Sequence, residues 1–387
     1  MIQVTLNDIN KFLLYKQYLT GETRTWNLIE LVRDIAGLHA TIPMTPYLSL
    51  FARTDNFAKE LLDEELYVRK HLGKIRSIRK TLYIFPQELI PAFHVATKRI
   101  NEKQSIKALE HRGISLNTYQ MISEAIIDIL RDKKEEMTAL EIKKALDTKL
   151  NISYILYLMC TQKLIIRGRP REYLLFDEYF PNLDFSKINE LKAVVDLVHY
   201  YLRAFGPVTE KDIIWWTGLG KIPIKEALTQ LQEKLLEVTV KDLDIDLLIL
   251  QSDINLLERV SSSVDRSVVN LLPTLDSYIM GYKERERYFQ SNNHIDYVFD
   301  RTGNATSVIL SMGQIIGVWD MNNEEPFKLR FFLFKETEEN IRNLIVQKAS
   351  IMGKFICNTE VLVEECESMI PLNERTAGSF MSPLKEK

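Results

Sequence analysis

The sequence predicts a protein of the α+β class, in which three helical units that each end in a pair of strands precede a smaller, strand-rich domain. Two observations predict this class. Apolar side chains recur at helical spacing in groups of three segments, and each group is followed by short β-branched and aromatic runs that are typical of strands. From about Leu271 alternating strands dominate, until a final amphipathic helix.

The first unit is predicted to span residues 1–100. Helical spacing is found over residues 3–20 and 27–38, and "TPYLSLFAR" begins a third helix. There Thr45 is a suitable N-cap, and Pro46 would occupy the first helical position, where its missing N–H costs nothing. "KIRSIRKTLYIFP" then predicts two strands. Three helices followed by a β-hairpin is the order of the winged helix, a variant of the helix-turn-helix.

The same order is predicted twice more, over residues 101–185 and 186–268. In the second unit, Thr138 and Glu141 form the pattern of a capping box, and "LIIRGRPREYLLF" predicts a strand pair. In the third unit, Thr209 is the predicted cap of a helix, and "LEVTVKDLDIDLLIL" predicts two strands. Residues 269–387 are predicted to form a small β-barrel-like domain with a final helix. The sequence thus predicts tandem winged helices before a barrel.

The composition is that of an ordinary soluble globular protein, with 46% hydrophobic and 27% charged residues among 387. No apolar run is long enough to span a bilayer and no signal peptide is evident, so a cytoplasmic protein without membrane contact is expected. The three cysteines and six histidines show no metal-ligand spacing, so we expect neither a metal nor a cofactor. Nothing in the sequence requires a dimer, and a monomer is expected.

The net charge is −3, so binding to nucleic acid would require positive charge that is concentrated locally. "RKHLGKIRSIRK" contains no acidic residue, and "KLIIRGRPREY" lies on a predicted wing, where arginines suit contact with phosphates or a groove. In "GYKERERYF" glutamates alternate with the basic residues, which fits a solvated face equally well. The candidate DNA-binding residues are Arg76, Arg79, Lys80, Arg167, Arg169, Arg171, Lys283 and Arg285.

A short segment between two predicted helices, "GLHAT", contains His39 and Thr41 two positions apart. In an extended segment the side chains of residues i and i+2 point the same way, so both could address one target. The alternative is structural: His39 could stabilise the end of the second helix, and Thr41 could satisfy a turn amide.

Several stretches resemble a known family. "YYLRAFGPVTEKDIIWWTGL" and "LLPTLDSYIMGYKERERYF" are similar to segments of the AlkZ/YcaQ family of bacterial winged-helix DNA glycosylases, and the second resembles the opening of that family's C-terminal β-barrel. "IRSIRKTLYIFPQEL" resembles the hairpin of its first domain, and "QIIGVWD" a barrel strand. The resemblance covers nearly the whole chain. It implies tandem winged helices closed by a small β-barrel and wrapped around duplex DNA.

The resemblance also gives the His39 segment a place, because family members carry Gln-x-Gln or Gln-x-Asp directly after the second helix. Here His39-Ala40-Thr41 occupies that position. The N-glycosidic bond breaks with oxocarbenium character at C1′, so a catalyst must hold a water molecule there. A neutral His39 would accept a proton from that water near its ordinary pKa, and Thr41 would orient the water.

Asp276, in "LLPTLDSY", is a third catalytic candidate, because a carboxylate near the sugar would stabilise the oxocarbenium. The alternative is that Asp276 bonds backbone amides in a turn or helix cap.

Trp215 and Trp216 follow two isoleucines in a predicted helix, which favours burial in the core over base stacking.

The resemblance implies a monofunctional DNA glycosylase that hydrolyses the N-glycosidic bond of alkylated or crosslinked purines, with double-stranded DNA as its partner. An alternative is a winged-helix protein that binds duplex DNA without catalysis, such as a regulator. A weaker third hypothesis is a protein–protein scaffold, since winged helices also serve that role and the net charge is slightly acidic.

Overall fold

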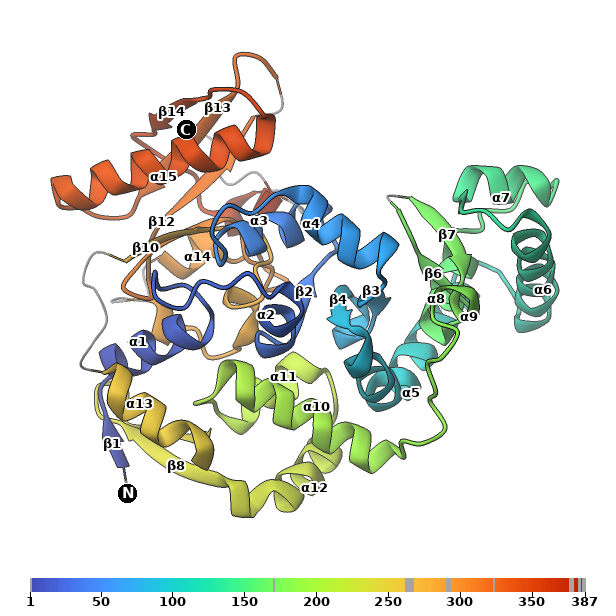
Figure 1. Ribbon diagram of the computed structural model, residues 1–387, viewed down its shortest axis with the longest axis horizontal. Helices are drawn as coiled ribbons and strands as arrows, with labels where there is room; N and C mark the ends of the chain where they lie inside the picture. Colours follow the sequence, from blue (N-terminus) through green and yellow to red (C-terminus); the bar gives the residue numbers. More distant parts are fainter. Residues whose placement is uncertain are drawn as a thin grey trace.

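The computed structural model describes residues 2–169, 171–261, 268–289, 294–322, 324–375, 379–381 and 384. Helices and strands alternate along the chain, which confirms the predicted α+β class. Figure 1 shows the first unit near the centre, the second on the right, the third at the bottom and the C-terminal sheet at the top.

The first unit begins with a capped helix. The Thr5 hydroxyl accepts the N–H of Asp8, and the Asp8 carboxylate accepts the N–H of Thr5. No side chain caps the third helix, which begins at Thr45 itself, so the predicted N-cap role of Thr45 is wrong. Its hydroxyl instead donates to the carbonyl of Thr274 at 2.8 Å. The elements are β1 (Ile2–Val4), α1 (Leu6–Lys16), α2 (Leu28–Asp34), β2 (Leu38–His39), α3 (Thr45–Phe51), α4 (Lys59–Asp63), β3 (Leu72–Arg76) and β4 (Leu82–Pro86).

A long helix, α5 (Ile90–Glu110), leads to the second unit, which buries an apolar cluster of its own. Thr138 and Glu141 form the predicted capping box at the start of α7. The elements of this unit are α6 (Leu116–Lys133), β5 (Met137–Thr138), α7 (Ala139–Ala145), α8 (Ser153–Gln162), β6 (Ile165–Arg167), β7 (Glu172–Leu175) and α9 (Phe176–Tyr179).

The third unit contains a buried aspartate that caps one helix and anchors a distant loop. Thr209 and Asp212 form a capping box at the start of α11. The second carboxylate oxygen of Asp212 accepts the backbone N–H groups of Lys283 and Glu284 at 2.8 and 2.9 Å. The elements are α10 (Glu190–Phe205), α11 (Glu210–Thr217), α12 (Lys221–Leu231), β8 (Leu235–Val240), β9 (Ile245–Leu250) and α13 (Ile254–Val260).

One strand order recurs in the three units. The sheets run β2-β4-β3 and β5-β7-β6, so the last strand of the unit lies between the other two. In the third unit Val208 bridges to Leu248 of β9, which also pairs with β8. The N-terminal β1 adds to this sheet as a parallel neighbour of β8 and so joins the start of the chain to the third unit.

The C-terminal sheet is open among the described residues. Its strand order is β10-β11-β12-β13-β14, whereas closure would require the last strand to pair with the first. The closed barrel implied by the resemblance is therefore not found. β14 joins β13 in parallel after a helical crossover, and that helix contacts β10, β13 and β14. The elements are β10 (Val269–Leu272), α14 (Ile295–Val298), β11 (Val308–Ser311), β12 (Gln314–Met321), β13 (Lys328–Leu333), α15 (Glu339–Cys357) and β14 (Leu362–Glu365).

A buried ion pair fastens the first unit to the segment after β10. The Arg53 guanidinium donates to both carboxylate oxygens of Asp276 at 2.8 Å, and neither side chain is exposed to solvent. Ser49 donates to the same carboxylate at 2.6 Å, and the N–H of Tyr278 at 3.0 Å. Ser277 donates to the carbonyl of Gly37 at 2.8 Å, two residues before His39. The position of His39 therefore depends on this junction.

Removing one partner of this pair is expected to destabilise the protein strongly. Arg53→Met leaves the Asp276 carboxylate buried without its cation, which costs about 3–5 kcal/mol in the free energy of unfolding. Chemical denaturation monitored by circular dichroism measures it. The matched control is Arg33→Met, which removes an exposed ion pair with Glu88 and should cost at most about 1 kcal/mol. Equal losses in the two variants would contradict this role.

Candidate active site

His39 and Thr41 lie at the end of a short strand in the centre of the first unit. His39 pairs with Tyr83 across β2 and β4, and the two rings are 5.0 Å apart. The N–H of Ala40 still bonds to Leu82, but the extended pairing stops there. His39 is 2% exposed, whereas Thr41 is exposed at the surface. The two side chains are therefore neighbours in sequence that lie at different depths.

The environment of His39 keeps its ring neutral. Burial and the nearby positive charge of Arg79 together lower its pKa to about 3, against an opposing effect of Asp276. The backbone N–H of Thr41 contacts Nδ1 at 3.5 Å, a long hydrogen bond in which Nδ1 is the acceptor. A neutral ring with that acceptor carries its proton on Nε2.

This geometry changes the chemistry expected of His39. A base with a pKa near its ordinary value would take a proton from water at neutral pH, as the sequence suggested. A neutral ring with a pKa of about 3 instead offers a hydrogen bond. Such a group can orient a water molecule or a sugar oxygen, which is also what an amide side chain does.

Asp276, the third catalytic candidate, lies in the ion pair with Arg53 and is fully buried. Both of its oxygens are engaged by protein donors. In this arrangement it holds the His39 segment against the C-terminal part of the chain. No local sequence pattern indicates this role of Arg53, because its partner lies 223 residues away.

A cluster of cations and aromatic rings adjoins His39. The Arg79 guanidinium lies 3.9 Å from the ring centroid of Trp215, and Arg285 lies 5.5 Å from the same ring. Arg285 also stacks on Phe299 at 3.6 Å. Trp216 is buried as expected, but Trp215 is partly exposed and holds two arginines that come from different units. The predicted burial of Trp215 in the core is therefore wrong, and no local sequence pattern indicates its contacts with the two arginines.

Comparison with known proteins agrees with this architecture. The family model described as "DNA glycosylase AlkZ-like" matches residues 32–335, a stretch that includes the His39 segment, Asp276 and the arginine cluster. The chain belongs to the AlkZ-like DNA glycosylase family. A solved structure, Streptomyces sahachiroi DNA glycosylase AlkZ, aligns with a TM-score of 0.76 over 94% of this chain and 100% of that one, at 17% identity. The search of curated proteins found no match.

The other basic candidates of this AlkZ-like chain separate into two groups. Arg76, Arg167 and Arg171 line a cavity of about 570 Å³ between the first and second units, together with Tyr157 and Tyr173. There the Arg76 guanidinium stacks on Tyr157 at 3.8 Å. The cavity therefore brings Arg76 of the first unit together with two arginines of the second hairpin.

The remaining candidates lie at turns. Arg169 is exposed at the tip of the second hairpin, where Glu136 accepts its backbone N–H at 3.1 Å and Glu172 is close by. The two glutamates offset part of the positive charge at this tip, which is therefore smaller than the run of arginines in the sequence suggests. Lys80 adopts a left-handed conformation at the first hairpin tip, and Lys283 is exposed.

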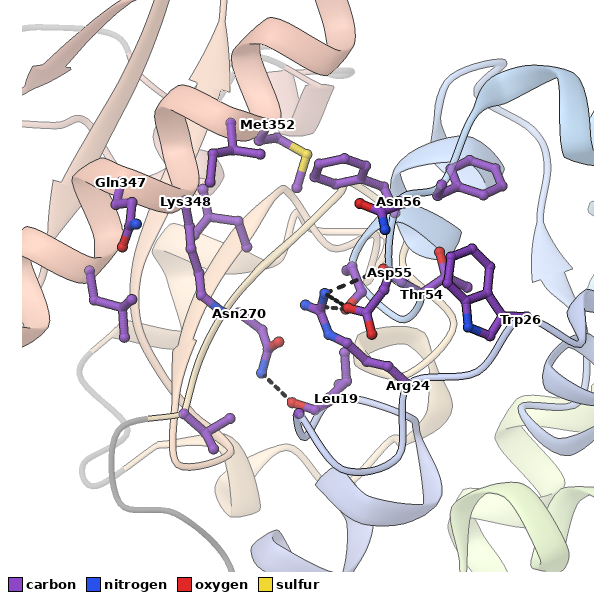
Figure 2. Close-up of a pocket in the computed structure, with 18 residues that line it drawn as sticks. Leu19, Arg24, Trp26, Thr54, Asp55, Asn56, Asn270, Gln347, Lys348 and Met352 are labelled. Atoms are coloured by element: carbon purple, nitrogen blue, oxygen red, sulfur yellow. Dashed lines mark hydrogen bonds and ion pairs between the residues drawn. The ribbon is translucent and has the colours of Figure 1, made fainter.

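A separate cleft of about 1,040 Å³ lies between α15 and the loops around α3, as Figure 2 shows. Lys348 and Met352 line it from the helix, and the Arg24–Asp55 ion pair and Trp26 line it from the first unit. His39 and Thr41 are not among its lining residues. The cleft is thus distinct from the candidate catalytic segment.

Within the described ranges, no three His, Cys, Asp or Glu side chains are grouped so that they could hold a metal ion. Cys160 and Cys357 are free thiols. Every helix in the described part of the chain is too short or too polar to cross a membrane.

The burial of His39 predicts a specific dependence of stability on pH. Above pH 6.5 the ring is neutral in both states, whereas between pH 6.5 and 3 only the unfolded chain gains the proton. Stability therefore falls as the pH falls, by about 1.4 kcal/mol per pH unit for each such group. His94, with a pKa lowered to about 2 by burial, should act in the same way.

The free energy of unfolding measured from pH 6 to 4.5 tests this. His39→Gln should reduce the dependence of the free energy of unfolding on pH by about 1.4 kcal/mol per pH unit, the contribution of one proton. The matched variant His94→Gln should do the same. A slope that His39→Gln leaves parallel to that of the wild type would show that the ring is not buried in the neutral form.

Proposed function

We propose that this protein is a monofunctional DNA glycosylase that hydrolyses the N-glycosidic bond of alkylated or crosslinked purines in duplex DNA. The observation that carries the proposal is the position of His39. A neutral, hydrogen-bonding ring occupies the place that the resemblance assigns to the first glutamine of Gln-x-Gln, inside the stretch matched by the glycosylase family model.

The chemistry fits a site that lacks a strong acid. An N7-alkylated purine is already cationic, so it leaves C1′ with the bonding electron pair and becomes a neutral base. Water then adds to the oxocarbenium at C1′ and releases a proton to solvent. The protein needs to position that water and tolerate the positive charge, and hydrogen-bonding groups suffice for both.

We assign separate roles to the three candidates. His39 orients the water or the sugar through Nε2–H, and exposed Thr41 contacts the DNA or the water from the mouth of the site. Asp276 is a positioning residue, because Arg53, Ser49 and the N–H of Tyr278 engage its oxygens.

The DNA partner is supported by the recurring units. We infer that all three are winged helices. In the first two units the last strand lies between the other two, and in the third β9 lies between β8 and the bridging residue Val208. The hairpin arginines, including those in the cavity between the first two units, would bind phosphates. The protein would act as a monomer in the cytoplasm, where the DNA is.

A glycosylase assay tests the proposal. The protein is incubated with duplex DNA that contains N7-methylguanine or an interstrand crosslink, and abasic sites are cleaved by alkali. His39→Ala should reduce the rate by about 100-fold, the scale of losing one oriented hydrogen-bonding group. His39→Gln should retain most of it, because an amide replaces the hydrogen bond. The rate should show no inflection near pH 6.5, since the ring is neutral throughout.

The opposite outcomes would be informative. Equal loss in His39→Gln and His39→Ala would contradict a hydrogen-bonding role. Absence of product from both duplexes, with salt-dependent binding intact, would favour the alternative of a DNA-binding protein without catalysis, which the 2% exposure of His39 also allows. Under either function, Arg167→Ala or Arg169→Ala should lower the salt dependence of binding by about one released counterion each.

A further inference from the structure

Four arginines are buried or half-buried near the junction of the first, third and C-terminal parts, and only two of them have an ion-pair partner in the described part of the chain. Arg53 pairs with Asp276 at 2.8 Å, and Arg287 lies 3.8 Å from Asp212. Arg79 and Arg285 have no carboxylate within ion-pair distance among the described residues. A guanidinium removed from water without a counter-charge is costly, so binding of an anion beside these two arginines would be favourable.

Several features of the surrounding structure hold Arg79 in place. It lies at the tip of the first hairpin with a φ of 47°, and Lys80 follows with a φ of 62°, both left-handed conformations that side chains rarely adopt. Its Nε is buried without a hydrogen-bond partner, while its plane stacks on Trp215. Gly218 makes room, because a Cβ there would approach Cγ of Arg79 to 3.0 Å.

Arg285 approaches the same tryptophan from the segment after the Asp276 turn. Its Nη2 donates to the carbonyl of Gly303 at 2.8 Å, but its Nε is also buried without a partner. Burial and the charge of Arg79 together lower the pKa of this guanidinium to about 10, against an opposing effect of Tyr288. Asp300 and Glu286 oppose it only from beyond ion-pair distance. The guanidinium groups of Arg79 and Arg285 therefore lie close to the same ring, and each has an Nε–H that donates no hydrogen bond.

This pair of arginines adjoins the candidate catalytic segment. Arg79 lies close enough to influence the titration of both His39 and Tyr83. Tyr83 is the strand partner of His39, and its buried hydroxyl also lacks a hydrogen-bond partner. Arg79 and Tyr83, each with an unused buried donor, therefore lie near His39, and Arg285 meets Arg79 at the ring of Trp215.

We propose that Arg79 and Arg285, both stacked on Trp215, form a binding site for one phosphodiester of DNA, the one that flanks the nucleotide whose base is removed at His39. The planar guanidinium fork matches two phosphate oxygens, and stacking on an indole fixes that fork before the ligand arrives. The assignment of the anion to DNA rests on the proposed function, whereas the site itself rests on the two unpaired cations.

Removing either cation should leave the stability of the free protein unchanged or raise it, but should weaken the binding of DNA. Arg79→Met keeps a side chain that packs over Trp215 but removes an unpaired cation, so the melting temperature of the free protein should stay the same or rise. Affinity for a duplex that carries a tetrahydrofuran abasic analogue should fall about tenfold, the loss of a charge-assisted contact. Arg285→Met should behave alike. Arg112→Met is the matched control, since Arg112 also stacks on a ring, that of Tyr154, but is exposed.

Inorganic phosphate gives a second readout that needs neither DNA nor activity. It should raise the melting temperature of the wild type in proportion to the logarithm of its concentration and have less effect on Arg79→Met. A lowered melting temperature in Arg79→Met without a phosphate effect in the wild type would show that the guanidinium is structural, and would overturn the site. Unchanged affinity of Arg79→Met for the abasic duplex would also overturn it.

Failure of the proposed function has a different signature. If the wild type responds to phosphate through Arg79 but does not bind the abasic duplex, the assignment of the anion to DNA is wrong. If the abasic duplex binds through Arg79 and Arg285 but no alkylated duplex is cleaved, the phosphodiester site stands and the glycosylase reaction fails.

Discussion

The ion pair between Arg53 and Asp276 is the contact on which the site depends. It joins the turn that follows α3 to the turn after β10, and both side chains are completely enclosed. Buried ion pairs contribute little net stability, because desolvation offsets their attraction, but they strongly disfavour any arrangement that separates them. The pair therefore fixes how the first unit meets the C-terminal part, and the neighbouring bond from Ser277 to Gly37 transmits that geometry to the strand of His39.

Asp212 joins the third unit to the segment after β10, as Asp276 joins that segment to the first unit. One carboxylate caps α11, receives two backbone N–H groups from the segment that contains Lys283, and lies near Arg287. Trp215 is on that same helix. The capping box thus fixes both the ring of Trp215 and the loop that brings Arg285 to it, so a local helix signal positions part of the proposed phosphodiester site.

Local features of the sequence predicted the order of elements well. Helical spacing and the caps at Thr138 and Thr209 are properties of a few adjacent residues, and the structure reproduces them. Long-range partners could not be inferred in this way. Thr45 bonds to Thr274 instead of capping its own helix, and the final strand joins in parallel, which leaves the C-terminal sheet open. Burial of His39, and with it the change from base to hydrogen-bond donor, also follows from tertiary packing.

The most direct test of the account is a crystal structure of the protein bound to duplex DNA with a tetrahydrofuran abasic analogue. We expect the analogue to lie beside His39, with one water molecule that accepts a hydrogen bond from Nε2 and lies next to the anomeric carbon. A flanking phosphate should contact Arg79 and Arg285. An analogue bound away from β2, for example in the cleft of Figure 2 beside α15, would contradict the assignment of His39 to the reaction.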